Sequence, residues 1–444
     1  MIDTAILSNR TITASGVQKA VILIKDGKIA GIEYAVPEGD FSITDVGDNV
    51  VMPGIVDPHV HINEPGRTEW EGFDTATKAA IAGGITSLIE MPLNASPVTT
   101  TVDAWNKKIE SASGKIHCHC GFWGGIIPGN EKEIVPLIEK GAWGFKAFLT
   151  HSGIDEFPDV SEADLRKVMP VIAKYDLPLL VHCEWEKAKT NLPENDVRLY
   201  THYLASRPKY WEDDAIALMI RLCEEYNCRT HIVHLSSANS IKQIAVAKSR
   251  GLPLTVETCQ HYLYFSAENI PDGKTEFKCA PPIREKENNE QLCKALEEGI
   301  IDFVATDHSP APPAMKEQAS GNFMKAWGGI ASLQLALPAL WTAAKKHNAS
   351  LTDIANWLCE KPALLPQLKR KGKIEKGADA DLTVWNPDES FIVTEEMIQH
   401  RHKITPYMGE QLLGVVKQTW LKGQKVYDDG KFLHLNKGNI LLHE

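Results

Sequence analysis

The sequence Val56-Asp57-Pro58-His59-Val60-His61 follows an apolar run at residues 49–55, which predicts one buried strand interrupted by Pro53-Gly54. Side chains two residues apart on a strand point to the same side, so His59 and His61 are expected to project together. Two imidazoles that converge at the carboxyl end of a buried strand supply half of a metal site. An H-x-H pair by itself is weak evidence for a metal site, because two histidines on one face of a strand are usually only polar neighbours. The interpretation therefore depends on further ligands at the ends of later strands.

The composition is that of an ordinary soluble enzyme or binding protein. Of the 444 residues, 43% are hydrophobic and 24% are charged, and the net charge of −11 disfavours a nucleic-acid surface. No basic and apolar leader opens the sequence, and no apolar run reaches membrane-spanning length. The nine cysteines are scattered without a C-x-x-C pair, so neither a disulfide framework nor a thiolate zinc site is indicated. A reducing, cytoplasmic location is expected.

From about residue 50 to residue 330 the sequence alternates between strand and helix patterns. Seven further strands are expected at 84–92, 115–122, 144–149, 177–184, 230–237, 254–259 and 301–308. Helical patterns lie between them, as at 73–82, 213–225 and 240–250. This pattern predicts an α/β fold, a (β/α)₈ TIM barrel. A doubly wound sheet is the main rival, but it would usually carry a Gly-rich phosphate turn where His59 and His61 stand.

Both ends of the sequence lack the strand and helix alternation of the central region. Residues 1–50 contain short strand patterns separated by turns such as Asp26-Gly27, and similar patterns return after residue 372. We expect residues 1–50 plus 372–444 to form a small β-sandwich module beside a barrel of residues 51–371.

Barrel enzymes place their chemistry at the carboxyl ends of the strands. Five of the eight expected strands end in residues that can bind a metal: His59, His61, Lys146, His182, His234 and Asp307. Taken singly, each has an ordinary alternative, such as a hydrogen-bonded core histidine or a helix N-cap. Their joint occurrence at strand ends makes coincidence a poor explanation.

Lys146 is the unusual member of this set, because it lies within an expected buried strand. Burial disfavours the ammonium form, lowers the lysine pKa and makes the amine nucleophilic. Such an amine can capture CO₂ as a carbamate, whose negative charge two cations would stabilise.

These residues resemble those of the amidohydrolase superfamily, and specifically its cyclic amidohydrolase branch, over essentially the whole chain. The resemblance implies that His59, His61 and Asp307 hold one divalent metal, that His182 and His234 hold a second, and that N6-carboxylated Lys146 bridges the two. Zinc is favoured, while cobalt, manganese and iron also suit these donors. A hydroxide bridging the metals would attack a ring amide carbonyl, and Asp307 would act as general base and then general acid.

The residues around this centre distinguish branches that act on different rings. Dihydroorotases carry an arginine where this sequence has Asn63, and a histidine where it has Ala311, so dihydroorotate is disfavoured. Hydantoinases and dihydropyrimidinases carry a tyrosine at the position of His151, which could itself be a hydrogen-bond donor.

The remaining pattern resembles the allantoinase group. The segments that carry this resemblance are residues 64–67, 91–94, 278–284, 307–313 and 323–330. The resemblance implies hydrolysis of allantoin, a neutral hydantoin with a ureido arm, to allantoate in purine-nitrogen degradation. It also implies substrate contacts from Asn94 and from main-chain groups near Cys279 and Ser309, although turn chemistry explains these residues equally well.

Three further expectations accompany this interpretation. The resemblance suggests a homotetramer, and the net charge and the lack of a long apolar run indicate no nucleic-acid or membrane partner. A hydantoinase or dihydropyrimidinase with relaxed specificity is the nearest alternative function. A non-catalytic scaffold relative is a third possibility, but such proteins typically lose metal ligands and this sequence keeps all six.

Overall fold

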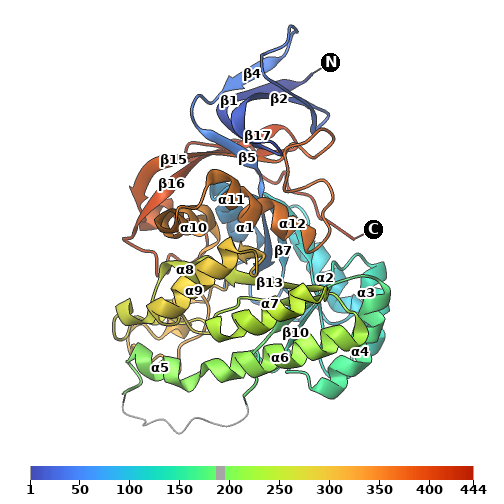
Figure 1. Cartoon of the computed structure of the whole chain (residues 1–444), viewed down its shortest axis with the longest axis vertical. Helices are drawn as coiled ribbons and strands as arrows, with labels where there is room; N and C mark the ends of the chain where they lie inside the picture. The colour runs from blue at the N-terminus through green and yellow to red at the C-terminus, as the bar shows by residue number, and fades with distance from the viewer. Residues whose placement is uncertain (1, 187–195, 444) are drawn as a thin grey trace.

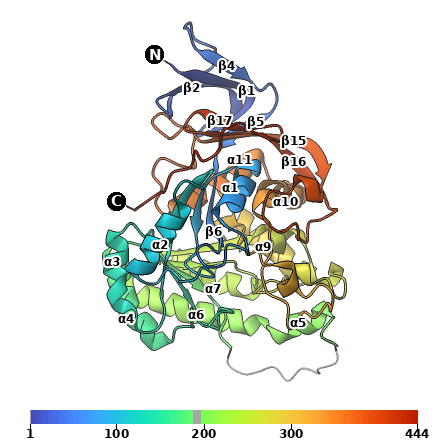
Figure 2. The same ribbon diagram turned by 180° about the vertical axis from the view of Figure 1, so that it is seen from behind.

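The computed structural model describes residues 2–186 and 196–443. Two parts are visible in Figure 1, a β-sheet module at one end and a helix-covered barrel at the other. The blue and red ends of the colour scale meet in the module, so segments far apart in the sequence lie side by side there (Figure 2).

The barrel is built from parallel strands in chain order. Its strands are β6 (Ile55–Val60), β7 (Ile85–Glu90), β8 (His119–Phe122), β9 (Gly124–Gly125), β10 (Phe145–Phe148), β11 (Leu179–His182), β12 (Thr230–Ile232), β13 (Leu254–Cys259) and β14 (Phe303–Ala305). β8 pairs with β7 and β9 pairs with β10, so these two short strands together occupy the third position. The ring closes where the backbone N–H of His61 donates to the carbonyl of His308 across 2.8 Å.

Helices follow the strands and form the outer layer of the barrel (Figures 1 and 2). They are α1 (Phe73–Ala82), α2 (Val102–Ala112), α3 (Ile134–Glu139), α4 (Glu162–Lys174), α5 (Tyr200–Ser206), α6 (Lys209–Tyr226), α7 (Ile241–Ser249), α8 (Gln260–Tyr264), α9 (Lys286–Glu297), α10 (Ala336–Ala344), α11 (Leu351–Ala355) and α12 (Lys361–Leu364). Their apolar faces pack on strands that are buried on both sides, which is the usual arrangement of a parallel sheet. The predicted (β/α)₈ fold class is confirmed.

The module is one nine-stranded sheet made from both ends of the chain. Its strands are β1 (Thr4–Thr13), β2 (Gly16–Lys25), β3 (Lys28–Glu33), β4 (Ser42–Asp45), β5 (Val50–Pro53), β15 (Leu382–Ile392), β16 (Gln411–Leu421), β17 (Gln424–Asp428) and β18 (Lys431–Phe432). The two ends join where β5 pairs with β1 on one side and with β15 on the other. The expected association of the terminal segments is therefore present, while the domain boundaries at 50/51 and 371/372 stay a prediction.

The expectation of one strand through residues 49–61 was wrong. The chain divides at Gly54 into β5, which belongs to the module, and β6, which opens the barrel. Gly54 fits this crossing because a Cβ atom there would lie 2.1 Å from Oγ1 of Thr86 on β7. Its N–H donates to the carbonyl of Asp381 across 2.8 Å, which ties the crossing to the C-terminal half of the module.

Two other expected strands end three or more residues sooner than predicted. The extended pattern through 230–237 stops at Ile232, and that through 301–308 stops at Ala305. His234 has φ of 39° and Asp307 has φ of 43°, a left-handed conformation that non-glycine residues rarely adopt. Such strain is typical of functional sites, where surrounding contacts impose the conformation. The turns aim both side chains at the barrel mouth instead of continuing the strands.

Substituting Gly54→Ala tests the crossing between module and barrel. We expect a loss of about 2 kcal/mol or more in the free energy of unfolding, because the added methyl group meets buried Thr86. Gly31→Ala is the matched control, since a Cβ atom there has its nearest contact at an ordinary 3.7 Å. Urea unfolding measures both variants, and equal stabilities would show that the crossing tolerates a side chain.

Candidate active site and metal centre

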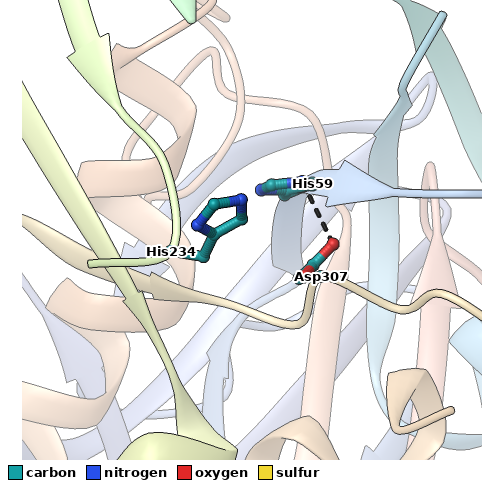
Figure 3. Close-up of side chains that lie close together, drawn as sticks. All are labelled: His59, His234 and Asp307. Atoms are coloured by element: carbon teal, nitrogen blue, oxygen red, sulfur yellow. Dashed lines mark ion pairs between the residues drawn. The ribbon is translucent and has the colours of Figure 1, made fainter. Parts of the chain in front are cut away.

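A cavity of 660 Å³ opens at the carboxyl ends of the barrel strands. Five of the six predicted metal ligands line it: His59, His61, His182, His234 and Asp307. Among the described residues, His59, His234 and Asp307 each bring one potential ligand atom within 4.8 Å of the others. Figure 3 shows these three side chains converging from β6 and from the segments that follow β12 and β14.

Two of the histidines face one carboxylate. His59 Nε2 lies 3.2 Å and His61 Nε2 lies 3.4 Å from Oδ1 of Asp307. Burial by itself raises the pKa of Asp307, but the charge of His59 and a hydrogen bond from His61 outweigh it and hold the pKa well below its usual value. Two imidazole nitrogens beside an ionised carboxylate form a donor set that suits a divalent transition metal.

The other two histidines face each other. His182 Nδ1 lies 3.0 Å from His234 Nε2 in the buried interior. Burial lowers the pKa of both imidazoles, and the charge of His182 lowers that of His234 further. Metal ligation requires neutral imidazole, so the environment favours the binding-competent form. The converging nitrogen atoms fit a second cation.

Lys146 lies beneath these groups on β10. It is 0% exposed, and among the described residues its Nζ atom has no hydrogen-bond partner. Burial lowers its pKa to about 8, and the Phe148 ring lies 5.0 Å from the nitrogen. An unpartnered buried amine costs free energy, which a carbamate shared between two cations would relieve. The residues present therefore fit a pair of divalent metals.

Glu257 on β13 supports the first histidine group, and the sequence analysis did not identify it. Its carboxylate accepts a hydrogen bond from Nδ1 of His59 and another, at 3.0 Å, from Nε2 of His231. Burial alone would raise the pKa of Glu257, but the charge of His59 and the hydrogen bonds from His231 and His59 lower it to about 2. The contact to Nδ1 leaves Nε2 of His59 free to bind a metal.

Glu184 orients the second pair of histidines, His182 and His234, as Glu257 orients His59. It accepts a hydrogen bond of 2.8 Å from Nε2 of His182, and Arg207 holds both of its oxygens. This contact orients Nδ1 of His182 toward His234. The sequence did carry a signal for Glu184 and Glu257, because each is the one acidic residue of an expected apolar strand. A carboxylate buried in such a strand requires a hydrogen-bond or charge partner.

Three of the four predicted substrate contacts line the cavity, namely Asn94, His151 and Ser309. Ser309 donates a hydrogen bond of 3.0 Å to Oδ1 of Asp307. His151 stands at the rim, with its side chain 58% exposed and 3.4 Å from Asp155. Cys279 lies behind the wall and is 1% exposed, whereas its neighbours Lys278 and Ala280 reach the cavity.

This fold and donor set define a metal-dependent hydrolase of the barrel type. The model of the amidohydrolase family matches residues 50–426. The chain belongs to the amidohydrolase family and, within it, to the group of the allantoinases.

Similar proteins match nearly the whole chain. The allantoinase of Streptomyces avermitilis is 46% identical, covering 100% of this chain and 99% of the relative. A mitochondrial allantoinase of Aquarana catesbeiana is 48% identical, covering 82% of this chain and 75% of the relative. Among solved structures, the L-hydantoinase (dihydropyrimidinase) from Arthrobacter aurescens superimposes with a TM-score of 0.92 at 31% identity, covering all of both chains.

Among the described residues, no helix has the length and apolar character needed to cross a bilayer.

Glu257→Gln tests the support beneath His59. We expect metal affinity to fall by about 10- to 100-fold, because a neutral amide no longer fixes the imidazole tautomer. Competition with a chromogenic zinc chelator measures the affinity, and the exposed Glu298→Gln is the control. Unchanged affinity in both variants would rule out this role of Glu257.

Proposed function

We propose that this protein hydrolyses the cyclic amide of allantoin to allantoate in purine-nitrogen degradation. The observation that carries the proposal is the convergence of two histidine pairs and Asp307 in a chain that matches allantoinases along nearly its full length. Allantoin is neutral, so a cavity without the carboxylate-binding arginine of dihydroorotases suits it.

We propose that His59, His61 and Asp307 hold one divalent metal, that His182 and His234 hold another, and that carboxylated Lys146 bridges them. Zinc is the favoured ion. Bound metals would supply Lewis acidity and an activated water at neutral pH. The described geometry supports this assignment, since His59 and His61 already face Asp307 and His182 faces His234.

Asp307 is the proposed proton carrier. Its Oδ1 faces His59 and His61 and accepts a hydrogen bond from Ser309, so the carboxylate is held at the place where a proton would be taken up and returned. Passing that proton to the ring nitrogen releases the leaving group as a neutral amide nitrogen. Ser309 fixes the carboxylate during both steps.

Asn94, His151 and main-chain groups near Cys279 and Ser309 are the proposed contacts to the ring. Arg67 fixes the Asn94 backbone by donating to its carbonyl across 2.7 Å. Lys278 and Ala280 line the cavity and the Cys279 side chain does not. We therefore propose that the substrate contacts backbone groups near Cys279 and not its thiol.

We further propose a homotetramer that works in the cytoplasm, with the module and the barrel divided at 50/51 and 371/372. Family resemblance supports the tetramer, and the scattered cysteines support a reducing compartment. The relative from Aquarana catesbeiana is named as a mitochondrial allantoinase.

The substrate is tested with metal-reconstituted protein assayed on allantoin, hydantoin, dihydrouracil and dihydroorotate. We expect the ring-opening rate on allantoin to exceed each of the others at least tenfold. Faster opening of hydantoin or dihydrouracil would keep the metal assignment and replace the function by that of a hydantoinase, the activity named for the Arthrobacter structure that this chain resembles.

The bridging role of Lys146 is tested with Lys146→Ala. We expect loss of bound metal and of activity, with partial rescue by short-chain carboxylic acids that take the place of the carbamate. Elemental analysis measures the metal content, and Lys140→Ala on the neighbouring surface is the control. Retention of two metals per subunit in Lys146→Ala would contradict the proposal.

A further inference from the structure

A second buried lysine, Lys278, lines the same cavity as the histidines. Lys278 is 9% exposed and lines the cavity wall. Its Nζ atom donates to the carbonyls of Ala326, at 2.6 Å, and Met324, at 3.3 Å. The ring of Tyr203 lies 5.0 Å from the same nitrogen. These contacts hold the ammonium in one place.

No carboxylate offsets this charge among the described residues. Burial, followed by the charges of Lys316 and Arg207, lowers the pKa of Lys278 to about 7, and no acidic group contributes. A buried ammonium without a counter-charge is costly. An uncharged acceptor from a ligand would reduce that cost through a charge-assisted hydrogen bond.

Lys316 shows the contacts of a purely structural lysine, because it lies close to Lys278 but does not line this cavity. It is 4% exposed and donates to three carbonyls, those of Trp327 at 3.0 Å, Gly329 at 2.8 Å and Lys278 at 3.4 Å. An ammonium has three N–H groups, so Lys316 uses its full capacity within the protein. Within residues 2–186 and 196–443, Lys278 donates to two carbonyls, which leaves one of its N–H groups without an acceptor there.

The backbone around Lys278 is fixed as firmly as its side chain. Tyr203 donates from its hydroxyl to the carbonyl of Cys279 across 2.6 Å, and the N–H of Gly329 donates to the carbonyl of Lys278 across 2.8 Å. Both Tyr203 and Gly329 line the same cavity as the catalytic groups. The spare N–H group is therefore presented by a preorganised wall, which reduces the entropy lost on binding.

We infer that Lys278 binds the carbonyl oxygen of the ureido arm of allantoin and thereby selects allantoin over hydantoins that lack this arm. The inference rests on the proposed function, which places the reacting ring at His59, His61 and Asp307. The arm projects from the ring, and its carbonyl is a strong neutral acceptor. A site built to hydrogen-bond a substrate group discriminates strongly against analogues without that group.

Lys278→Met tests this role, because it removes the ammonium and keeps an unbranched apolar stem. We expect KM for allantoin to rise at least tenfold with kcat changed less than threefold, as for an interaction equally strong in ground and transition states. The inhibition constant of hydantoin as a competitor should change less than twofold. Lys278→Arg, which keeps the charge, should restore part of the affinity. The exposed Lys274→Met is the control and should match the parent protein.

Two results would overturn the inference. An unchanged KM for allantoin in Lys278→Met would show that the ammonium makes no contact with substrate. Parallel weakening of allantoin and hydantoin, with a fall in kcat, would show that Lys278 only supports the loop at residues 324–329. Failure of the parent protein to open allantoin would instead contradict the proposed function itself, so the two failures are distinguishable.

Discussion

Closure of the barrel between its last and first strands is the constraint on which the site depends. The hydrogen bond from the His61 N–H to the His308 carbonyl joins the segment that follows β6 to the segment that follows β14. A second hydrogen bond joins the same two parts of the barrel, where the Thr306 hydroxyl donates to the carboxylate of Asp57 across 2.6 Å. These bonds place the H-x-H pair beside Asp307, although almost 250 residues separate them in the sequence. Without this closure the first group of ligands would not exist.

Burial governs the chemistry of the site in two opposite ways. It lowers the pKa of His59, His182 and His234 and that of Lys146, which favours the uncharged forms needed for metal ligation and carboxylation. It would also neutralise the acids, but Glu257 and Glu184 stay ionised because histidines and Arg207 surround them. The same low-polarity interior therefore lowers the pKa of the bases, while hydrogen bonds and nearby charges keep the pKa of the acids low.

Much of the fold was readable from the sequence because hydrophobic periodicity records burial directly. The helix at 73–82 and the strand at 254–259 were predicted with their observed bounds. The interruption at Pro53-Gly54 was predicted, but the change of sheet there was missed, since an apolar run looks the same whether it crosses one sheet or two. The early ends of β12 and β14 were missed because His234 and Asp307 adopt left-handed conformations that neighbouring sequence does not encode.

By itself the sequence determined the fold class, the family and the six candidate ligands, because residue types at strand ends are local information. Tertiary structure alone decided which atoms meet. It showed Nδ1 of His182 facing Nε2 of His234, Glu257 beneath His59, and Lys278 with an N–H group to spare at the cavity wall. These facts depend on contacts between residues distant in the sequence, and each contact is fixed by the packing of the whole barrel.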